Sequence, residues 1–292
     1  MPLANAPPPG APMLPADTFA GQVVCVTGGG TGLGKAIAVE FARAGADVAI
    51  ASRDAGHRAA GVAAVEALGR RAVGTAVDVR EPDEIARSFD EVEAALGPVS
   101  ILINNAAGNF PVPAERMSPR AWRSVVDIVL NGTFFCSAEF ARRRIARGKG
   151  GAILNIGATT AWTGGPASAH SAAAKAGVDN LTRSLAVEWA PDDIRVNCLA
   201  PGAFPSPDRS DHATQMAATA RRGAASVPAQ RVGEPHELGY MAVFMCSPFA
   251  AYLTGQVVAL DGGNWLRRYG FSMPDFEVVR DRFDRLKAES PP

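Results

Sequence analysis

Residues 23–44 read VVCVTGGGTGLGKAIAVEFARA, which is an apolar run, a glycine-rich turn and a helical stretch in succession. The run Val23–Thr27 predicts a buried strand, and the segment from Gly34 to Ala44 predicts a helix. Three glycines of the turn allow a tight bend, close approach of the backbone to a pyrophosphate, and packing of the helix on the strand. This strand–turn–helix unit predicts a dinucleotide site. The turn residues expected to contact the phosphates are Gly28, Thr31, Gly32, Leu33 and Gly34.

The rest of the chain repeats this alternation of short apolar runs and longer helical stretches. The further predicted strands are Asp47–Ala51, Ala72–Val77, Ser100–Ile103, Ala152–Ile156, Ile194–Cys198 and Gln256–Leu260. The further predicted helices are an alanine-rich stretch ending at Leu68, Asp83–Leu96, Ser118–Ala146, Ser168–Trp189 and Pro235–Cys246. Strands this apolar, separated by helices, predict an α/β fold with a doubly wound, Rossmann-like parallel sheet covered by helices on both faces.

The composition favours a soluble, cytoplasmic protein with one domain. The formal net charge is zero, so nothing in it indicates a nucleic-acid partner, and the four cysteines are too far apart to suggest a metal site. No run approaches the roughly eighteen apolar residues that a membrane helix needs. We expect a disordered, proline-rich leader at residues 1–17, a dinucleotide-binding domain at 18–264 and a C-terminal extension at 265–292. No second alternation of strands and helices follows the first.

Several motifs occur in an order that resembles the short-chain dehydrogenase/reductase family. They are TGGGTGLG at 27–34, NNAAG at 104–108, Asn131, Lys175 and Pro201-Gly202, and the resemblance covers about residues 18–264. It implies an oxidoreductase that binds a nicotinamide dinucleotide. The residues that the resemblance assigns to this cofactor are Asp78 and Val79 at the adenine, Asn105, Ala106 and Gly108 on the nicotinamide side, and also Lys175, Pro201 and Gly202.

The end of the second predicted strand indicates which form of the cofactor is bound. An acid at this place accepts a hydrogen bond from the 2′-hydroxyl of NAD, whereas a cation favours the 2′-phosphate of NADP. The chain reads Ala51-Ser-Arg-Asp54, with no acid at the strand tip and Arg53 directly after Ser52. Because a guanidinium group matches a phosphate in a bidentate geometry, Ser52 and Arg53 predict NADPH.

The catalytic tetrad of the family is incomplete in this sequence. Ordinary members reduce ketones with Asn, Ser, Tyr and Lys, of which Tyr donates the proton and Lys holds the nicotinamide ribose. Asn131 and Lys175 occupy two of these places, but Ser171 stands where the family carries Tyr, and Ala158 where it carries Ser. Reduction of a ketone leaves an alkoxide that needs a positioned acid. Reduction of a C=C bond conjugated with a thioester leaves an enolate that needs hydrogen-bond donors, so the remaining residues favour the second reaction.

One branch of the family, the 2,4-dienoyl-CoA reductases, is similar to this pattern. The similar stretches are IASR at 50–53, NNAAGNF at 104–110, ERMSP at 115–119, DIVLNGT at 127–133 and Ser171-x-x-x-Lys175. By this resemblance Asn109 holds the thioester oxygen, Ser171 assists it, and Lys175 fixes NADPH. Thr160 stands where the mitochondrial type carries a further tyrosine. The resemblance implies reduction of an acyl-CoA substrate in fatty acid metabolism.

Two other functions stay open at the level of sequence. One is a carbonyl reductase or alcohol dehydrogenase with a relocated acid, for which His170 or Tyr269 is available. The other is a dinucleotide-binding protein without turnover. The weakly periodic region Phe204–Arg231 predicts a mobile lid. The long helices Ser118–Ala146 and Ser168–Trp189 resemble those that pair between subunits of the family, so we expect a homotetramer, with a dimer as the alternative.

Overall fold

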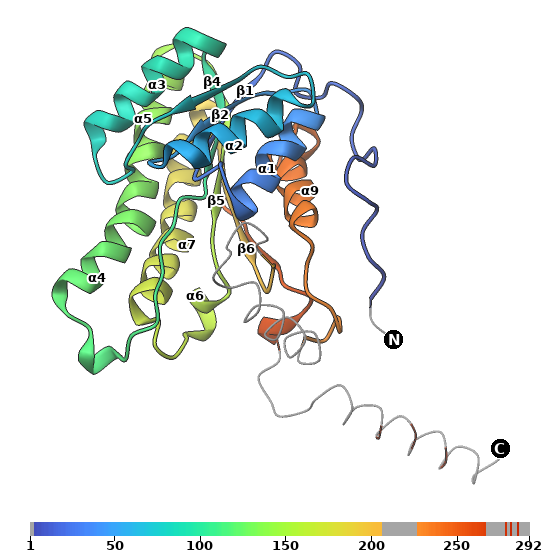
Figure 1. The fold of residues 1–292 in the computed structure, drawn as a ribbon, viewed down its shortest axis with the longest axis vertical. Helices are drawn as coiled ribbons and strands as arrows, with labels where there is room; N and C mark the ends of the chain where they lie inside the picture. The colour runs from blue at the N-terminus through green and yellow to red at the C-terminus, as the bar shows by residue number, and fades with distance from the viewer. Residues whose placement is uncertain (1–2, 206–226, 267–277, 279–280, 282–284, 286–292) are drawn as a thin grey trace.

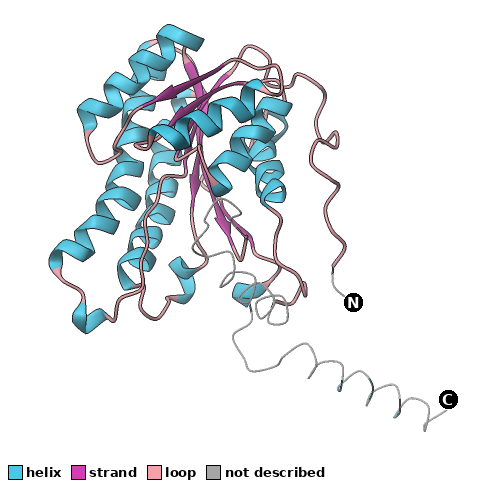
Figure 2. Cartoon of the chain, viewed as in Figure 1, coloured by secondary structure: helices cyan, strands magenta, loops and turns pink. Residues whose placement is uncertain are grey.

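The computed structural model describes residues 3–205 and 227–266, together with residues 278, 281 and 285. Its centre is one parallel sheet with the strand order β3-β2-β1-β4-β5-β6-β7 (Figure 2). The strands are β1 (Val23–Thr27), β2 (Asp47–Ala51), β3 (Ala72–Thr75), β4 (Val99–Asn104), β5 (Gly151–Ile156), β6 (Ile194–Pro201) and β7 (Val257–Leu260). The predicted doubly wound parallel sheet in a single domain is confirmed.

Helices cover both faces of this sheet in two groups (Figure 1). One face is covered by α1 (Gly32–Arg43), α2 (Ala55–Glu66) and α9 (Pro235–Cys246). The other face is covered by α3 (Pro82–Leu96), α5 (Gly132–Ala146) and α7 (Ala169–Trp189), and α4 (Pro119–Val126) packs against α7. Shorter helical segments are Ala114–Arg116, α6 (Thr160–Thr163), Ala190–Asp192, Pro248–Ala250 and Asn264–Leu266.

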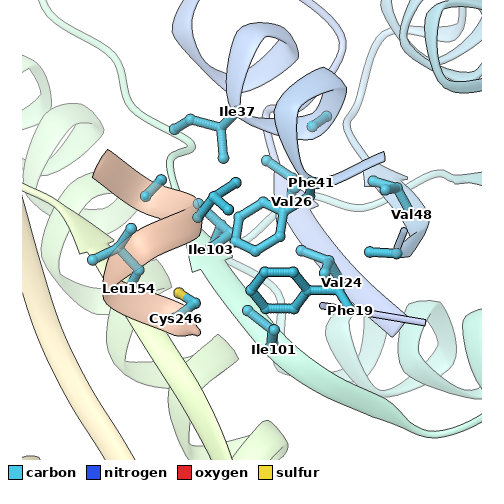
Figure 3. Close-up of a cluster of buried hydrophobic side chains, with 14 of the residues drawn as sticks. Phe19, Val24, Val26, Ile37, Phe41, Val48, Ile101, Ile103, Leu154 and Cys246 are labelled. Atoms are coloured by element: carbon cyan, nitrogen blue, oxygen red, sulfur yellow. The ribbon is translucent and has the colours of Figure 1, made fainter. Parts of the chain in front are cut away.

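A large hydrophobic cluster lies on each face of the sheet, because successive side chains of a strand point in opposite directions. Val24 and Val26 of β1 belong to the cluster beneath α1 and α9, which Figure 3 shows. Val23 and Cys25, which alternate with them, belong to the cluster beneath α3, α5 and α7. Each central strand is therefore packed from both sides, and this fixes the positions of the loops that leave its ends.

The long helix predicted at Ser118–Ala146 is interrupted in its hydrogen-bonding pattern. A π-helical turn, Asp127–Asn131, joins α4 to α5. By length and composition alone, the described helix Pro119–Ala146 also suits a membrane span, but 44% of its most apolar window is buried inside the fold. Phe140, for example, is fully buried in the core beside the sheet.

Residues 3–17 of the predicted leader contain no helix or strand, but two of their carbonyl oxygens lie against α9, and the disorder of this leader stays a prediction. The carbonyl oxygen of Pro8 accepts a hydrogen bond from the Tyr240 hydroxyl at 2.6 Å, and that of Pro7 lies 3.1 Å from Nε2 of His236. Proline has no N–H group but keeps a carbonyl oxygen that accepts. Further partners come from the residues before α9, where Arg231 donates to the carbonyl oxygen of Ala4 at 3.2 Å and the backbone N–H of Leu3 donates to that of Ala229 at 3.0 Å. Residues 206–226 of the predicted lid, Tyr269 and most of the C-terminal extension lie outside the described residues.

Candidate active site

A cleft of about 660 Å³ opens at the carboxyl ends of the central strands. In open α/β sheets this crevice, where the strand order reverses, is the usual place for a ligand. The predicted cofactor residues that line it are Gly28, Thr31, Gly32, Leu33, Gly34, Ser52, Arg53, Asp78, Val79, Asn105 and Ala106. The predicted cofactor residues outside its lining are Gly108, Lys175, Pro201 and Gly202. Gly30, His57 and Phe204 also line the cleft and were not predicted.

The backbone angles and close packing of the glycine-rich turn require glycine at several positions. Gly28 and Gly32 have φ angles of 65° and 53°, in the left-handed region that favours glycine. A Cβ atom on Gly30 would lie 2.2 Å from the carbonyl oxygen of His57, and one on Gly34 would lie 2.4 Å from that of Gly28. The turn therefore presents bare backbone at the start of α1. This geometry fits the pyrophosphate of a dinucleotide.

Side-chain hydrogen bonds join the ends of β1 and β4 beside the cleft. Oγ1 of Thr27 accepts from the backbone N–H groups of Asn105 and Ala106, each at 3.0 Å. Nδ2 of Asn105 in turn donates to the carbonyl oxygen of Thr27 at 3.0 Å. The buried Asn104 donates to Oδ1 of Asn155 on β5 at 2.9 Å. This network fixes the loop after β4, which carries the residues assigned to the nicotinamide.

Charged side chains gather near the tip of β2. Asp78 accepts a hydrogen bond from Nε of Arg80 at 2.9 Å, and hydrogen bonding by Arg80 is the main reason why the pKa of this carboxyl is lowered. Arg53 is farther away, since its guanidinium lies 3.7 Å from Asp78 and its side chain is 63% exposed. Arg58 donates to the carbonyl oxygens of Ser52 and Arg53 at 2.7 and 2.8 Å, which holds the strand tip. The Arg53 guanidinium thus stays accessible in a cleft that it lines.

Asn131 ends the π-helical turn between α4 and α5. Its Nδ2 donates to Oδ1 of Asp127 at 2.9 Å. A π turn inserts one extra residue into a helix and occurs frequently at functional sites. The next residue, Gly132, is so close to the cleft that a Cβ atom there would lie 2.7 Å from Cγ2 of Val79. Ile128 of the same turn lines the cleft, whereas Asn131 lies outside its lining.

Lys175 is buried between α7 and the end of β5. Only 8% of the residue is exposed, and its Nζ donates a hydrogen bond to the carbonyl oxygen of Ile156. Burial lowers the pKa of the ammonium group, against the opposing influence of Cys198 and Asp179. Asp179, one helical turn further on, is also buried, and desolvation raises the pKa of its carboxyl. The amine is therefore held at a defined place close to the carboxyl edge of the sheet.

The other predicted catalytic residues lie on three segments. Ser171 lies one turn before Lys175 on α7, and its backbone N–H donates to Nδ1 of His170 at 2.9 Å. Thr160 begins α6, a helix of four residues that was not predicted. Asn109 is exposed on the loop after β4. These three predicted catalytic residues therefore come from separate loops and helix ends, outside the lining of the cleft.

A second hollow, of about 640 Å³, lies at the amino ends of the strands and contains none of the predicted site residues. Within residues 3–205 and 227–266 no group of three metal-binding side chains occurs. The four cysteines are buried free thiols, and burial raises the pKa of Cys25 to about 12. The cleft at the carboxyl ends is therefore the candidate site.

Residues 28–264 match the sequence model of a family described as "Enoyl-(Acyl carrier protein) reductase". Together with the fold and the ordered motifs, this match shows that the chain belongs to the short-chain dehydrogenase/reductase family. The protein is therefore an oxidoreductase that binds a nicotinamide dinucleotide, as predicted.

Individual relatives agree with this membership. The chain is 40% identical over 251 residues to a Bacillus subtilis (strain 168) protein named "Probable 2,4-dienoyl-CoA reductase", and the match covers 86% of this chain and 99% of that protein. A solved short chain dehydrogenase from Bacillus anthracis is 41% identical with a TM-score of 0.79, covering 87% and 100% of the two chains. A solved structure from Agrobacterium tumefaciens with bound NADP is 33% identical with a TM-score of 0.78, covering 87% and 100%.

Proposed function

We propose that the protein is an NADPH-dependent reductase of conjugated acyl-CoA thioesters, of the 2,4-dienoyl-CoA type. The observation that carries this proposal is Ser171 in place of the family's tyrosine, while Lys175 and Asn131 are retained. Lys175 keeps a defined position without a tyrosine partner, because Ile156 accepts its hydrogen bond. The similarity to a Bacillus subtilis protein named as a dienoyl-CoA reductase supports the same assignment.

The two possible reactions make different demands on this site. The bound cofactor supplies a hydride to the substrate. A ketone that accepts a hydride becomes an alkoxide, and a positioned acid has to protonate it. In a conjugated thioester the electron pair moves to the thioester oxygen, and water then protonates a carbon atom. The oxygen needs only donors, which the Asn109 amide and the Ser171 hydroxyl supply without losing a proton.

The choice of NADPH is supported by the strand tip of β2. Arg53 lines the cleft, is exposed, and has Asp78 as a carboxylate neighbour that Arg80 already binds more closely. An exposed guanidinium that is not held closely by a carboxylate can bind a 2′-phosphate in a bidentate geometry. The related structure with bound NADP is consistent with this assignment. Lys175 is the group that we assign to the nicotinamide ribose.

The decisive experiment compares substrates with the wild-type protein. NADPH consumption is followed with a 2,4-dienoyl-CoA, with a 3-ketoacyl-CoA and with simple ketones. We expect rapid reduction of the dienoyl thioester alone. Reduction of the ketones without the dienoyl thioester would replace this proposal by the carbonyl reductase with a relocated acid. Cofactor binding without turnover of any substrate would favour a binding protein without catalytic activity.

A single amide tests the role of the loop after β4. Asn109→Ala should lower turnover of the dienoyl thioester roughly ten- to a thousand-fold, the range found when one donor to a developing oxyanion is removed. NADPH binding should not change, because the Asn109 amide is assigned to the thioester oxygen of the substrate and not to the cofactor. Asn5→Ala, at an exposed position of the N-terminal segment, is the matched control and should leave both properties unchanged.

A further inference from the structure

His170 carries a buried N–H group that no described residue binds. The residue is fully buried near the start of α7, and its Nδ1 accepts from the backbone N–H of Ser171 at 2.9 Å. Because Nδ1 accepts, the ring proton lies on Nε2. Nε2 is buried and has no hydrogen-bond partner within the described parts of the chain. A buried donor in this condition destabilises the folded state, so its presence requires an explanation.

The imidazole ring lies next to the loop that is assigned to the substrate. The ring of Phe110 packs edge-on against it, with 4.9 Å between the ring centroids and 89° between the planes. Phe110 follows Asn109 directly and is 39% exposed. The backbone N–H of Val112 donates to the carbonyl oxygen of Ala167 at 2.9 Å, which ties this loop to the segment before α7. One partly exposed ring therefore packs on His170 beside the loop that carries Asn109.

The other buried polar side-chain atoms without a partner, among the described residues, offer different chemistry. They are Nε of Arg70, Nε of Arg231, Oδ1 of Asn104 and Oδ2 of Asp179. Both arginines use their remaining N–H groups, Arg70 with the carbonyl oxygen of Gly45 and Arg231 with Glu237. The two oxygen atoms are acceptors and cannot stabilise an anion. Of this set, only Nε2 of His170 is a donor next to the Asn109 loop.

We propose that His170 supplies the donor to the substrate oxygen that the missing tyrosine leaves vacant. Its Nε2–H binds the thioester oxygen after the Phe110 ring has moved aside. This role rests on the proposed reduction of a conjugated thioester. When hydride adds to the conjugated carbon, the electron pair moves to the thioester oxygen, which Nε2–H and the Asn109 amide bind. Water then protonates a carbon atom of the enolate, and the histidine keeps its own proton.

A neutral imidazole is suited to this position. The neutral ring still offers one N–H group, and in other enzymes a neutral histidine at a helix N-terminus polarises a carbonyl group in this way. His170 thereby differs from a relocated acid, which would have to transfer its proton to substrate.

The absorption spectrum of the bound substrate tests this contact directly. A hydrogen bond to the oxygen of a conjugated thioester shifts its ultraviolet band to longer wavelength. The spectrum of a 2,4-dienoyl-CoA is recorded in the full-length protein with NADP⁺, which cannot reduce it. We expect a red shift in the wild-type complex, its loss in His170→Met, and its partial retention in His170→Gln, which keeps an N–H group at similar length. Turnover with NADPH should fall roughly ten- to a thousand-fold in His170→Met, with NADPH affinity unchanged.

Control variants separate the possible outcomes. His236→Met removes another buried histidine, on α9, and should keep the red shift. An unshifted spectrum of the substrate in the wild-type protein overturns the proposal. The proposal is also overturned if Thr160→Val loses the red shift while His170→Met keeps it. If His170→Met does not fold, the wild-type spectrum and His170→Gln decide. Normal turnover and an intact shift in His170→Met refute the role of His170 alone. Failure of the wild-type protein to bind or reduce the dienoyl thioester refutes the proposed function as well.

Discussion

At the tip of β2, we predict that the charge of one side chain, Arg53, decides whether NADPH or NADH binds more tightly. Arg53 is 63% exposed, and its nearest carboxylate, Asp78, is bound more closely by Arg80. We predict that NADPH raises the melting temperature more than NADH at equal concentration, because a ligand stabilises the folded state according to its concentration over its dissociation constant. Arg53→Asp should shrink or reverse this difference, since it places a carboxylate beside the 2′-phosphate.

A matched charge reversal controls for this effect. Arg116 is 79% exposed and does not line the cofactor cleft, so Arg116→Asp should keep the wild-type preference. A wild-type protein that melts at a higher temperature with NADH than with NADPH would contradict the assignment of the cofactor.

If Lys175 binds the cofactor as we propose, we predict that cofactor binding depends on pH in a defined direction. Burial lowers the pKa of its ammonium group, so this group loses its proton at a lower pH than an exposed lysine does. NADPH affinity should therefore decline as the pH rises through the lowered pKa. Lys175→Arg keeps its charge at every accessible pH, so the alkaline decline should disappear, whereas Lys175→Met should weaken binding throughout. The measurement is the dissociation constant of NADPH against pH, and an identical decline in wild type and Lys175→Arg would assign it to another group.

At the scale of the element, α9 depends on a charged cap. Glu237 accepts from the backbone N–H of Glu234 at 2.8 Å and pairs with Arg231 at 2.7 Å, and this pairing lowers the pKa of its carboxyl. A carboxyl with a lowered pKa stabilises the folded state above its ordinary pKa, and this contribution is lost as the pH falls through the folded-state value. Glu237→Gln should therefore reduce the free energy of unfolding at pH 7 by about 1 kcal/mol, with a smaller difference in acid.

Urea unfolding at neutral and at acid pH measures both parts of this prediction. Glu66→Gln, at an exposed position of α2, is the control and should match the wild type at each pH. A difference between Glu237→Gln and wild type that stays constant with pH would show that the hydrogen-bond geometry, and not the charge of Glu237, stabilises the helix.

The elements differ in how far their sequence determines them. β1, β2 and α9 have their predicted bounds, because buried strands read as continuous apolar runs and Pro235 marks a helix start. β3 stops at Thr75, earlier than predicted, where its pairing with Ala51 ends. β6 continues to Pro201 because its last residues pair with β7. Both ends depend on strands distant in sequence, and the four residues of α6 are too few to show a helical period.

The same division applies to the candidate site. Most of the turn residues that line the cleft follow from one local motif, so the sequence was sufficient for Gly28, Thr31, Gly32, Leu33 and Gly34. Gly30 was missed although it lies in that motif, since only the approach of His57 shows how closely it is packed. Phe204 and the unpaired Nε2 of His170 depend on contacts between distant segments, which no spacing along the chain reveals.

For the molecule as a whole, the outer faces of α4, α5 and α7 carry apolar side chains that a single chain leaves exposed. Trp122 is 40% exposed, Phe134 43% and Val187 78%. The outward positions Ala173 and Ala176 of α7 are small, which permits close approach of a second helix. Exposed apolar groups on neighbouring elements are typical of interaction surfaces. We therefore propose a homotetramer that uses these helices.

One substitution on this surface tests the assembly. Phe134→Glu places a charge at the proposed contact between subunits, where burial of an unpaired carboxylate is strongly unfavourable. Light scattering at micromolar concentration should give four times the 30.3 kDa chain mass for wild type and a smaller assembly for Phe134→Glu. Met13→Glu, at a position 44% exposed outside these helices, should leave the mass unchanged. A monomer mass for wild type would refute the tetramer. An unchanged mass for Phe134→Glu would instead exclude α5 as the contact. A carboxylate that replaced a buried phenyl ring would disrupt the contact between the subunits.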